Sequence, residues 1–223
     1  MNISENLKYI HSQLPGTVKL VAVSKTKSKE EIMVAYHAGQ RLFGENKVQE
    51  LTAKWQELPK DIEWHFIGHL QTNKVKQLVP FISMIHGVDS FKLLSAINME
   101  AGKIERIVPV LLEFHVAEEE SKFGLTRNDA EEMLSLPEMS SMKNISIKGV
   151  MGMATFADDH DKIRTDFRNL YNIFRNLKDK FFSHDKQFCE ISMGMSDDYI
   201  LAIQEGSTIV RIGSRIFGTR INV

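Results

Sequence analysis

One lysine of the sequence stands where an amine could react with an aldehyde. Lys25 ends the apolar segment LVAVSK, so its side chain would lie among apolar walls at the end of a strand. Removal of water around an amine lowers its pKa and increases the fraction of the nucleophilic neutral form. Repulsion from Lys27 and Lys29 would lower that pKa further. A solvated lysine at a strand end is the alternative interpretation.

The segment SMGMS, residues 192–196, could bind an anion. Gly194 would let the backbone come close to a ligand, and the segment precedes a predicted helix at 197–204. We expect Ser196 to cap this helix, whose N-terminal amides would attract negative charge. In the alternative interpretation, Met193 and Met195 fill gaps in the core and the glycine only forms a turn.

The segment RIGS, residues 211–214, follows the last apolar run and contains a second candidate for the same anion. Gly213 would leave backbone amides open to a ligand. Arg211 itself lies within the apolar run TIVRI, and a buried arginine needs a partner. The partner is either an acid such as Glu190 or Asp89, or an acceptor nitrogen of a bound heterocycle. Sequence spacing leaves both possibilities open.

Other candidate sites have weaker support. His65 and His69 are four residues apart, but they flank an expected strand end and lack the glutamate of a zinc-protease helix, so we do not expect a metal site. Cys189 lies in an apolar run, which favours an inert buried thiol. Walker A and GxGxxG motifs are absent from the sequence.

The elements that must position these residues recur along the chain. Short apolar runs alternate with helix-like segments, and several runs are apolar on both faces, as buried parallel strands are. This pattern predicts an α/β fold, a single (β/α)₈ TIM barrel domain spanning residues 1–223, with an open doubly wound sheet as the alternative. The runs cover residues 18–24, 41–44, 64–67, 84–88, 108–114, 147–153, 188–191 and 208–212.

The intervening helices show amphipathic spacing and end signals. We expect Ser28 to cap a helix that ends at Gly39, and further helices at 48–58 and 163–177. Residues 2–14 would add an extra N-terminal helix before the first strand. Active sites of such barrels lie at the carboxyl ends of the strands, with phosphate bound by the loops after strands seven and eight. These are the places where Lys25 and the two glycine segments stand.

Composition limits the environment and the partners. Apolar residues make up 43% of the 223 residues and charged residues 26%, and the formal net charge is −1. We therefore expect a globular protein that binds neither nucleic acid nor membrane. The N-terminus lacks the features of a signal peptide, and one cysteine excludes an internal disulfide framework. A cytoplasmic location follows as an expectation.

Several segments together carry a resemblance to a known family. The sequence resembles the YggS/PROSC family, the pyridoxal phosphate homeostasis proteins, whose barrel is similar to the N-terminal domain of alanine racemase. The matching segments are AVSKTKSKEEI (22–32), FGENKVQEL (43–51), WHFIGHLQTNK (64–74), IHGVDS (85–90), EESKFGL (119–125), SMGMSDDY (192–199) and AIQEGSTIVRIGSRIFGTR (202–220).

The resemblance implies a site for pyridoxal 5′-phosphate (PLP) and assigns roles by motif. The lysine of AVSK, Lys25, would form the Schiff base with the cofactor, and the asparagine of GEN, Asn46, would lie beside it. Arg211 would face the pyridine nitrogen. Ser196, Gly213 and Ser214 would hold the phosphate, while Ser192, Met193, Gly194 and Met195 would line the ring and phosphate side.

The resemblance also implies a role in vitamin B6 supply rather than catalysis. We expect a regulator or carrier of PLP, with apo PLP-dependent enzymes as candidate partners, present as a monomer or weak dimer. The chain ends at Val223, so we expect it to lack the added domain with which racemases of this fold supply a second acid or base. The alternatives are a one-domain PLP-dependent amino-acid racemase and a partner-binding scaffold whose PLP is structural.

Overall fold

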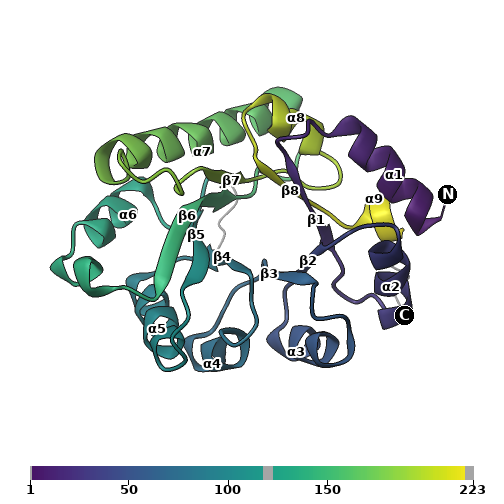
Figure 1. Cartoon of the computed structure of the whole chain (residues 1–223). Helices are drawn as coiled ribbons and strands as arrows, with labels where there is room; N and C mark the ends of the chain where they lie inside the picture. Colours follow the sequence, from purple (N-terminus) through teal and green to yellow (C-terminus); the bar gives the residue numbers. More distant parts are fainter. Residues whose placement is uncertain (1, 118–122, 219–223) are drawn as a thin grey trace.

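The computed structural model describes residues 2–117 and 123–218 of the chain. Within them, eight parallel strands pair in sequence order, and β8 pairs with β1 to close a barrel (Figure 1). The predicted (β/α)₈ barrel is confirmed, and the open sheet is wrong. The strands are β1 (Lys19–Val23), β2 (Leu42–Glu45), β3 (Glu63–Phe66), β4 (Met84–Val88), β5 (Val108–Phe114), β6 (Ile145–Gly152), β7 (Glu190–Ser192) and β8 (Ile209–Ile212).

Helices cover the outside of the barrel (Figure 1). The expected N-terminal helix is α1 (Ile3–Gln13), and it lies against α9 (Ser214–Phe217), where Asn6 Nδ2 donates to the backbone oxygen of Ile216 at 3.0 Å. None of the helices in residues 2–117 and 123–218 is long and apolar enough to cross a bilayer. The others are α2 (Lys29–His37), α3 (Val48–Glu57), η1 (Thr72–Lys74), α4 (Val75–Leu78), α5 (Phe91–Gly102), α6 (Arg127–Leu134), η2 (Pro137–Ser141), α7 (His160–Phe181) and α8 (Tyr199–Gln204).

Two features of these helices follow directly from the sequence. Ser28 caps α2 as predicted, since its Oγ accepts from the backbone N–H of Glu31 at 3.3 Å. The long α7 buries Ile163, Phe167 and Leu170, which recur at intervals of three and four residues. The predicted amphipathic helix at 163–177 is therefore part of a longer helix that begins at His160.

The interior of the barrel is layered along the strands. Side chains of a strand alternate between its two faces, so β1 sends Val21 and Val23 inward and Leu20 and Ala22 toward the helices. One inner layer is apolar, and polar side chains from β4, β5, β7 and β8 lie nearer the carboxyl ends of the strands. The apolar layer comprises Val21, Met84, Leu111, Met151 and Ile209, and the polar side chains are His86, Glu113, Ser192 and Arg211.

The seventh strand begins later than the sequence predicts. Phe188, placed in the strand by its apolar run, is instead fully buried below α7, where its ring stacks on Phe174 and Phe182 at centroid distances of 5.1 and 4.1 Å. Pairing with β6 begins only at Glu190. Cys189, between them, is exposed, so the prediction of a buried thiol is wrong.

Candidate functional site

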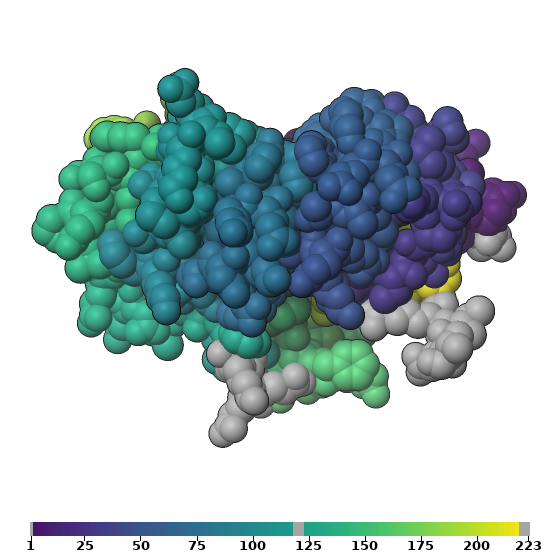
Figure 2. Space-filling model, turned by 90° about the horizontal axis from the view of Figure 1, so that it is seen from below, coloured from purple at the N-terminus to yellow at the C-terminus, as the bar shows by residue number. Residues whose placement is uncertain are grey.

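A pocket of about 420 Å³ opens at the carboxyl ends of the strands. This is the end of the barrel at which the loop after β6, residues 153–158, projects beyond the helices (green in Figure 2). Barrel active sites lie at this end. The lining residues are Val23, Lys25, Lys27, Asn46, Ile67, Gly68, Met153, Met195, Ser196, Asp197, Arg211, Gly213, Ser214 and Gly218.

Lys25 enters the pocket because it lies two residues beyond the end of β1. It follows Val21 and Val23 at the period of two residues that points side chains into the barrel. Lys27 also lines the pocket, but its Nζ donates to the backbone oxygen of Phe217 at 3.0 Å and lies 3.3 Å from the carboxylate of Glu31.

Lys29 does not contribute to this site. Its side chain forms an ion pair with Glu57 of α3 on the outside of the barrel. The structure therefore does not place Lys29 beside Lys25 in the pocket wall. The reason is that the cap at Ser28 starts α2, which directs the following residue away from the barrel mouth.

The loops after β7 and β8 meet in the wall of the pocket. The backbone N–H of Gly213 donates to Ser196 Oγ at 3.3 Å, and the N–H of Arg211 donates to the backbone oxygen of Gly194 at 3.0 Å. These bonds join the two glycine segments that the sequence singled out. Ser196 is buried and Ser214 is exposed, and both line the pocket.

Ser196 does not cap a helix, so this prediction is wrong. The turn before α8 is closed by Asp198, whose side chain accepts from the N–H of Met195, and the helix begins at Tyr199. The sequence alone suggested an earlier start at 197, because serine and aspartate are both strong capping residues. Ser196 instead ties its own loop to Gly213.

Arg211 is buried and donates hydrogen bonds to neighbouring strands. Its guanidinium donates to the backbone oxygen and Oγ of Ser192 at 2.9 and 2.6 Å, and to the backbone oxygen of Gly152 at 3.2 Å. Burial lowers the pKa of Arg211 to about 10, which the charge of Glu113 opposes, so the group stays a cation at neutral pH. Arg211 also lines the pocket, and a guanidinium has five N–H donors, two more than these three bonds use.

Neither acid suggested as a partner of Arg211 pairs with it. Glu190 lies near the opposite end of β7, where it accepts from Lys19 and from Thr208. Asp89 lies 3.5 Å from His69. Among the described residues, no carboxylate is recorded within ion-pair distance of the Arg211 guanidinium. The simple salt-bridge interpretation is therefore wrong.

A chain of buried polar groups runs from Arg211 through the inside of the barrel. His86 Nδ1 lies 3.0 Å from Ser192 Oγ, and His86 Nε2 lies 2.9 Å from His65 Nδ1. Burial lowers the pKa of His65 to about 3 and that of His86 well below 6.5, so both rings are neutral at neutral pH. Because arginine can only donate, Ser192 Oγ accepts from Arg211, and the tautomer of His86 sets the direction of the bond between Ser192 and His86.

Glu113 adds an acidic side chain to this inner layer. Burial and, second, the nearby charge of Asp89 raise its pKa to about 7, although the charge of Arg211 acts in the opposite direction. The carboxyl group therefore changes its charge near neutral pH. This makes the electrostatic field around Arg211 sensitive to pH in that range.

Known proteins of similar sequence place the chain in a family. The alanine racemase N-terminal domain model matches residues 1–221. The pyridoxal phosphate homeostasis protein of Vibrio alginolyticus is 35% identical across 98% of this chain and 98% of its own length. The protein of that name from Mus musculus is 41% identical across 91% of this chain and 77% of its own length. The chain belongs to the pyridoxal phosphate homeostasis protein family.

Solved structures agree with this membership. PipY of Synechococcus elongatus, a structure with PLP bound, is 35% identical and has a TM-score of 0.88, covering 97% of this chain and 100% of PipY. An alanine racemase of Clostridium difficile has a TM-score of 0.76 at 16% identity, which shows a shared fold. That match covers 99% of this chain and 60% of the racemase. The family resemblance identified from the sequence is confirmed.

The pocket of this family member brings together most of the site residues that were predicted from the sequence. Those in its wall are Lys25, Asn46, Met195, Ser196, Arg211, Gly213 and Ser214. Three other predicted residues lie behind the wall. Ser192 bonds to Arg211, Met193 is fully buried in the core, and Gly194 packs against α8.

Sequence reasoning did not assign several lining residues to the site. Lys27 and Asp197 carry charge there, and Gly218 lies at the end of α9. Ile67, Gly68 and Met153 come from the ends of β3 and β6. One signal in the sequence could have identified some of them. Side chains alternate between the two faces of a strand, and the alternation continues past the strand end, so Ile67, two positions beyond His65, points into the barrel.

We expect Gly194→Ala to lower the free energy of unfolding by about 2 kcal/mol. Gly194 has φ 92°, and an added Cβ would lie 2.5 Å from the Cβ of Ala202 in α8. Chemical denaturation should show this loss. Gly16→Ala is the matched control, because Gly16 has nothing within 4 Å of an added Cβ. Equal stability of the two variants would contradict the packing of this loop.

Proposed function

We propose that this chain binds PLP as a Schiff base on Lys25 and serves PLP homeostasis in the cytoplasm by holding the cofactor and delivering it to apo-enzymes. One observation carries the proposal: the side chain of Lys25 lines the same pocket as the two serine-containing loops after β7 and β8. The names of its relatives and the PLP-bound structure of PipY support the same cofactor.

The residues of the pocket fit the chemical groups of PLP. Lys25 offers the amine that an aldehyde requires. Ser196 accepts from Gly213, so its own hydroxyl hydrogen can donate to a phosphate oxygen, and Ser214 offers a second hydroxyl. Lys27 adds positive charge near these donors. A volume of about 420 Å³ is in the ordinary range for a small-molecule site.

We assign the other predicted site residues to the ring, to the phosphate or to the support behind the pocket wall. Arg211 would donate to the pyridine nitrogen, Asn46 would lie beside the ring, and Met195 would cover part of it. Gly213 would let the backbone approach the phosphate. Ser192, Met193 and Gly194 would act from behind, by holding Arg211 and the loop after β7 in place.

The character of Arg211 would limit the carbanion chemistry of a bound PLP ring. A PLP ring supplies an electron sink for carbanions, which is strongest when its nitrogen is protonated. Arg211 remains a cation at neutral pH and can only donate a hydrogen bond. Next to that nitrogen, it would keep the nitrogen as an unprotonated acceptor and so weaken the electron sink.

Cofactor transfer tests this function. The purified chain is loaded with PLP, its visible absorption is recorded, and it is mixed with an apo PLP-dependent enzyme in the presence of a scavenger of free PLP. We expect a visible band that decays as enzyme activity appears, because the cofactor is held reversibly. Incubation with L-alanine should show no racemisation at typical enzyme rates of about 1–10³ s⁻¹.

Two outcomes would contradict the proposal. Racemisation in that range would make the chain a one-domain racemase. A bound band without any transfer would favour a scaffold in which PLP is structural. Serum albumin that carries PLP on its surface lysines serves as the control for nonspecific transfer of PLP to the apo-enzyme.

A further inference from the structure

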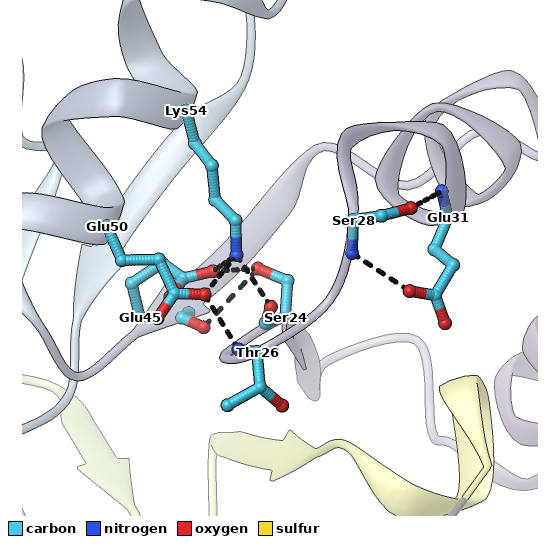
Figure 3. A network of polar contacts seen from close by, with 8 residues as sticks. Ser24, Thr26, Ser28, Glu31, Glu45, Glu50 and Lys54 are labelled. Atoms are coloured by element: carbon cyan, nitrogen blue, oxygen red, sulfur yellow. Dashed lines mark hydrogen bonds and ion pairs between the residues drawn. The ribbon is translucent and has the colours of Figure 1, made fainter. Parts of the chain in front are cut away.

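A group of charged side chains lies outside the barrel wall, beside Ser24 and Thr26, the residues before and after Lys25 (Figure 3). Glu45 of β2 points away from the pocket, toward α3, where Lys54 meets it with Nζ 2.7 Å from Glu45 Oε1. Lys54 also lies 2.7 Å from Glu50 Oε1, one turn earlier in α3. Ser24 Oγ donates to Glu45 Oε1 at 2.6 Å. We call Glu45, Glu50 and Lys54 the α3 charge cluster.

The α3 charge cluster holds both peptide units that flank Lys25. Lys54 Nζ donates to the backbone oxygen of Ser24 at 2.8 Å, which fixes the peptide before Lys25. The backbone N–H of Thr26 donates to Glu50 Oε1 at 2.7 Å, which fixes the peptide after it. Because Lys54 and Glu50 are themselves paired, one connected group of side chains binds the backbone at Ser24 and at Thr26 (Figure 3).

The clamped segment contains backbone strain. Thr26 has φ 66°, a left-handed conformation that is a genuine outlier for a β-branched residue. Such strain persists only where surrounding interactions enforce it, and it is concentrated at functional sites. Two bonds hold it here: Thr26 N–H donates to Glu50, and the N–H of Lys27 donates to the backbone oxygen of Ser24 at 3.0 Å. The strained turn follows the end of β1 and contains the lysine.

Stability alone does not explain the α3 charge cluster. The side chains of Glu45 and Lys54 are 0% and 6% exposed, and Glu45 Oε2 has no hydrogen-bond partner in the described structure. Buried ion pairs of this kind are often no more stabilising than apolar residues of the same volume, because each charge loses its water. The cluster therefore needs a reason other than the strength of the fold.

We propose that Glu50 and Lys54, anchored by Glu45, are positioning residues that hold the backbone on both sides of Lys25 so that its amine stays at the place where it meets the aldehyde. This inference rests on the proposed function of Lys25. It makes the binding of an aldehyde ligand depend on side chains outside the barrel wall, which do not line the pocket.

Glu50→Ala is the variant that tests this proposal. It removes the acceptor for the Thr26 N–H, while Lys54 keeps Glu45 and Ser24 as partners. Lys54→Met is unsuitable, because it would leave the buried carboxylate of Glu45 unpaired and endanger folding. Glu50→Gln is the conservative variant, since its amide oxygen can still accept from Thr26. Glu57→Ala, in the exposed pair between α3 and Lys29, is the matched control.

Two ligands separate positioning from loss of structure. PLP engages Lys25 through its aldehyde, whereas pyridoxine 5′-phosphate has the same phosphate and ring but no aldehyde. We expect Glu50→Ala to weaken PLP binding, measured by borohydride fixation at Lys25, about tenfold, which is the scale of one hydrogen bond to a charged group. Affinity for pyridoxine 5′-phosphate should stay unchanged, and hydrogen exchange at the Thr26 amide should accelerate.

The results distinguish a failure of the proposed function from a failure of the positioning role. Absence of fixation at Lys25 in the unmodified protein overturns the proposed function and this inference with it. Normal fixation in the unmodified protein and equal fixation in Glu50→Ala overturns only the positioning role. An equal fall for both ligands also overturns it, because a loosened pocket would weaken both. Recovery in Glu50→Gln, with Glu57→Ala unchanged, supports it.

Discussion

Lys25→Ala should abolish covalent attachment of PLP while the barrel stays folded. The variant removes the amine that the proposal assigns to the aldehyde, and alanine at this pocket-wall position leaves the strand pairings of β1 intact. Incubation with PLP, reduction with borohydride and peptide mass spectrometry measure the modification. We expect one modified peptide, containing Lys25, in the unmodified protein and none at this site in the variant. The visible band of the bound cofactor should disappear as well.

The neighbouring lysines make this test specific. Lys29→Ala is the control, because Lys29 pairs with Glu57 outside the barrel and should leave the label on Lys25 unchanged. Lys27 is the competing nucleophile, since it lines the same pocket, although its amine donates to Phe217 and pairs with Glu31. A label on Lys27 in the unmodified protein would contradict the assignment.

The fold and the place of Lys25 in the pocket could be predicted because both depend on local pattern. Apolar runs alternating with amphipathic helices predict a parallel barrel, and Lys25 follows Val21 and Val23 at the period that points into it. The two glycine segments follow strands seven and eight, which the barrel fold brings together. These inferences need the order of the strands and no knowledge of individual side-chain contacts.

The polar networks could not be predicted, because they join residues that are far apart in the sequence. His86 and Ser192 are 106 positions apart, and only closure of the barrel brings them within 3.0 Å. Glu45 and Asn46 are neighbours at a strand end, yet Asn46 lines the pocket and Glu45 faces α3. A strand boundary known to within one or two residues does not decide between two such neighbours.

The local errors have a common physical cause. Ser196 has the side chain of a helix cap, but Asp198 forms the turn and leaves Ser196 to bond Gly213. Phe188 has the hydrophobicity of a strand residue, but it packs beneath α7. In each case the side chain satisfies its preference in a neighbouring element, and tertiary packing decides which element that is.

The unmodified protein should lose stability as pH rises toward 7, and Glu113→Gln should not show this loss. Burial, followed by the charge of Asp89, raises the pKa of Glu113 from 4.5 to about 7. Below pH 4.5 the carboxyl is protonated in both the folded and the unfolded chain, and it contributes no difference. Between pH 4.5 and about 7 the unfolded chain ionises this carboxyl while the buried group of the folded chain keeps its proton, so the free energy of unfolding falls across this window by at most about 3 kcal/mol and levels off above it.

The difference between variant and unmodified protein isolates this effect. Denaturant unfolding between pH 5 and 8 should show the stability of Glu113→Gln rising relative to the unmodified protein as pH increases. His65 has a lowered pKa of about 3, so its contribution to stability is lost as pH falls below about 6.5, but both proteins share it and it cancels.

A second acid provides the control of opposite sign. Lys180 and Arg127 lower the pKa of Glu131 by hydrogen bonding, so its contribution is present at high pH and is lost as pH falls. Glu131→Gln should therefore be slightly less stable than the unmodified protein, by an amount that stays flat between pH 5 and 8 and shrinks only as pH falls below 4.5; the amount is small because the group is partly exposed. A difference for Glu113→Gln that stays flat across the range would mean that Glu113 is fully solvated and that the field on Arg211 is constant near neutral pH.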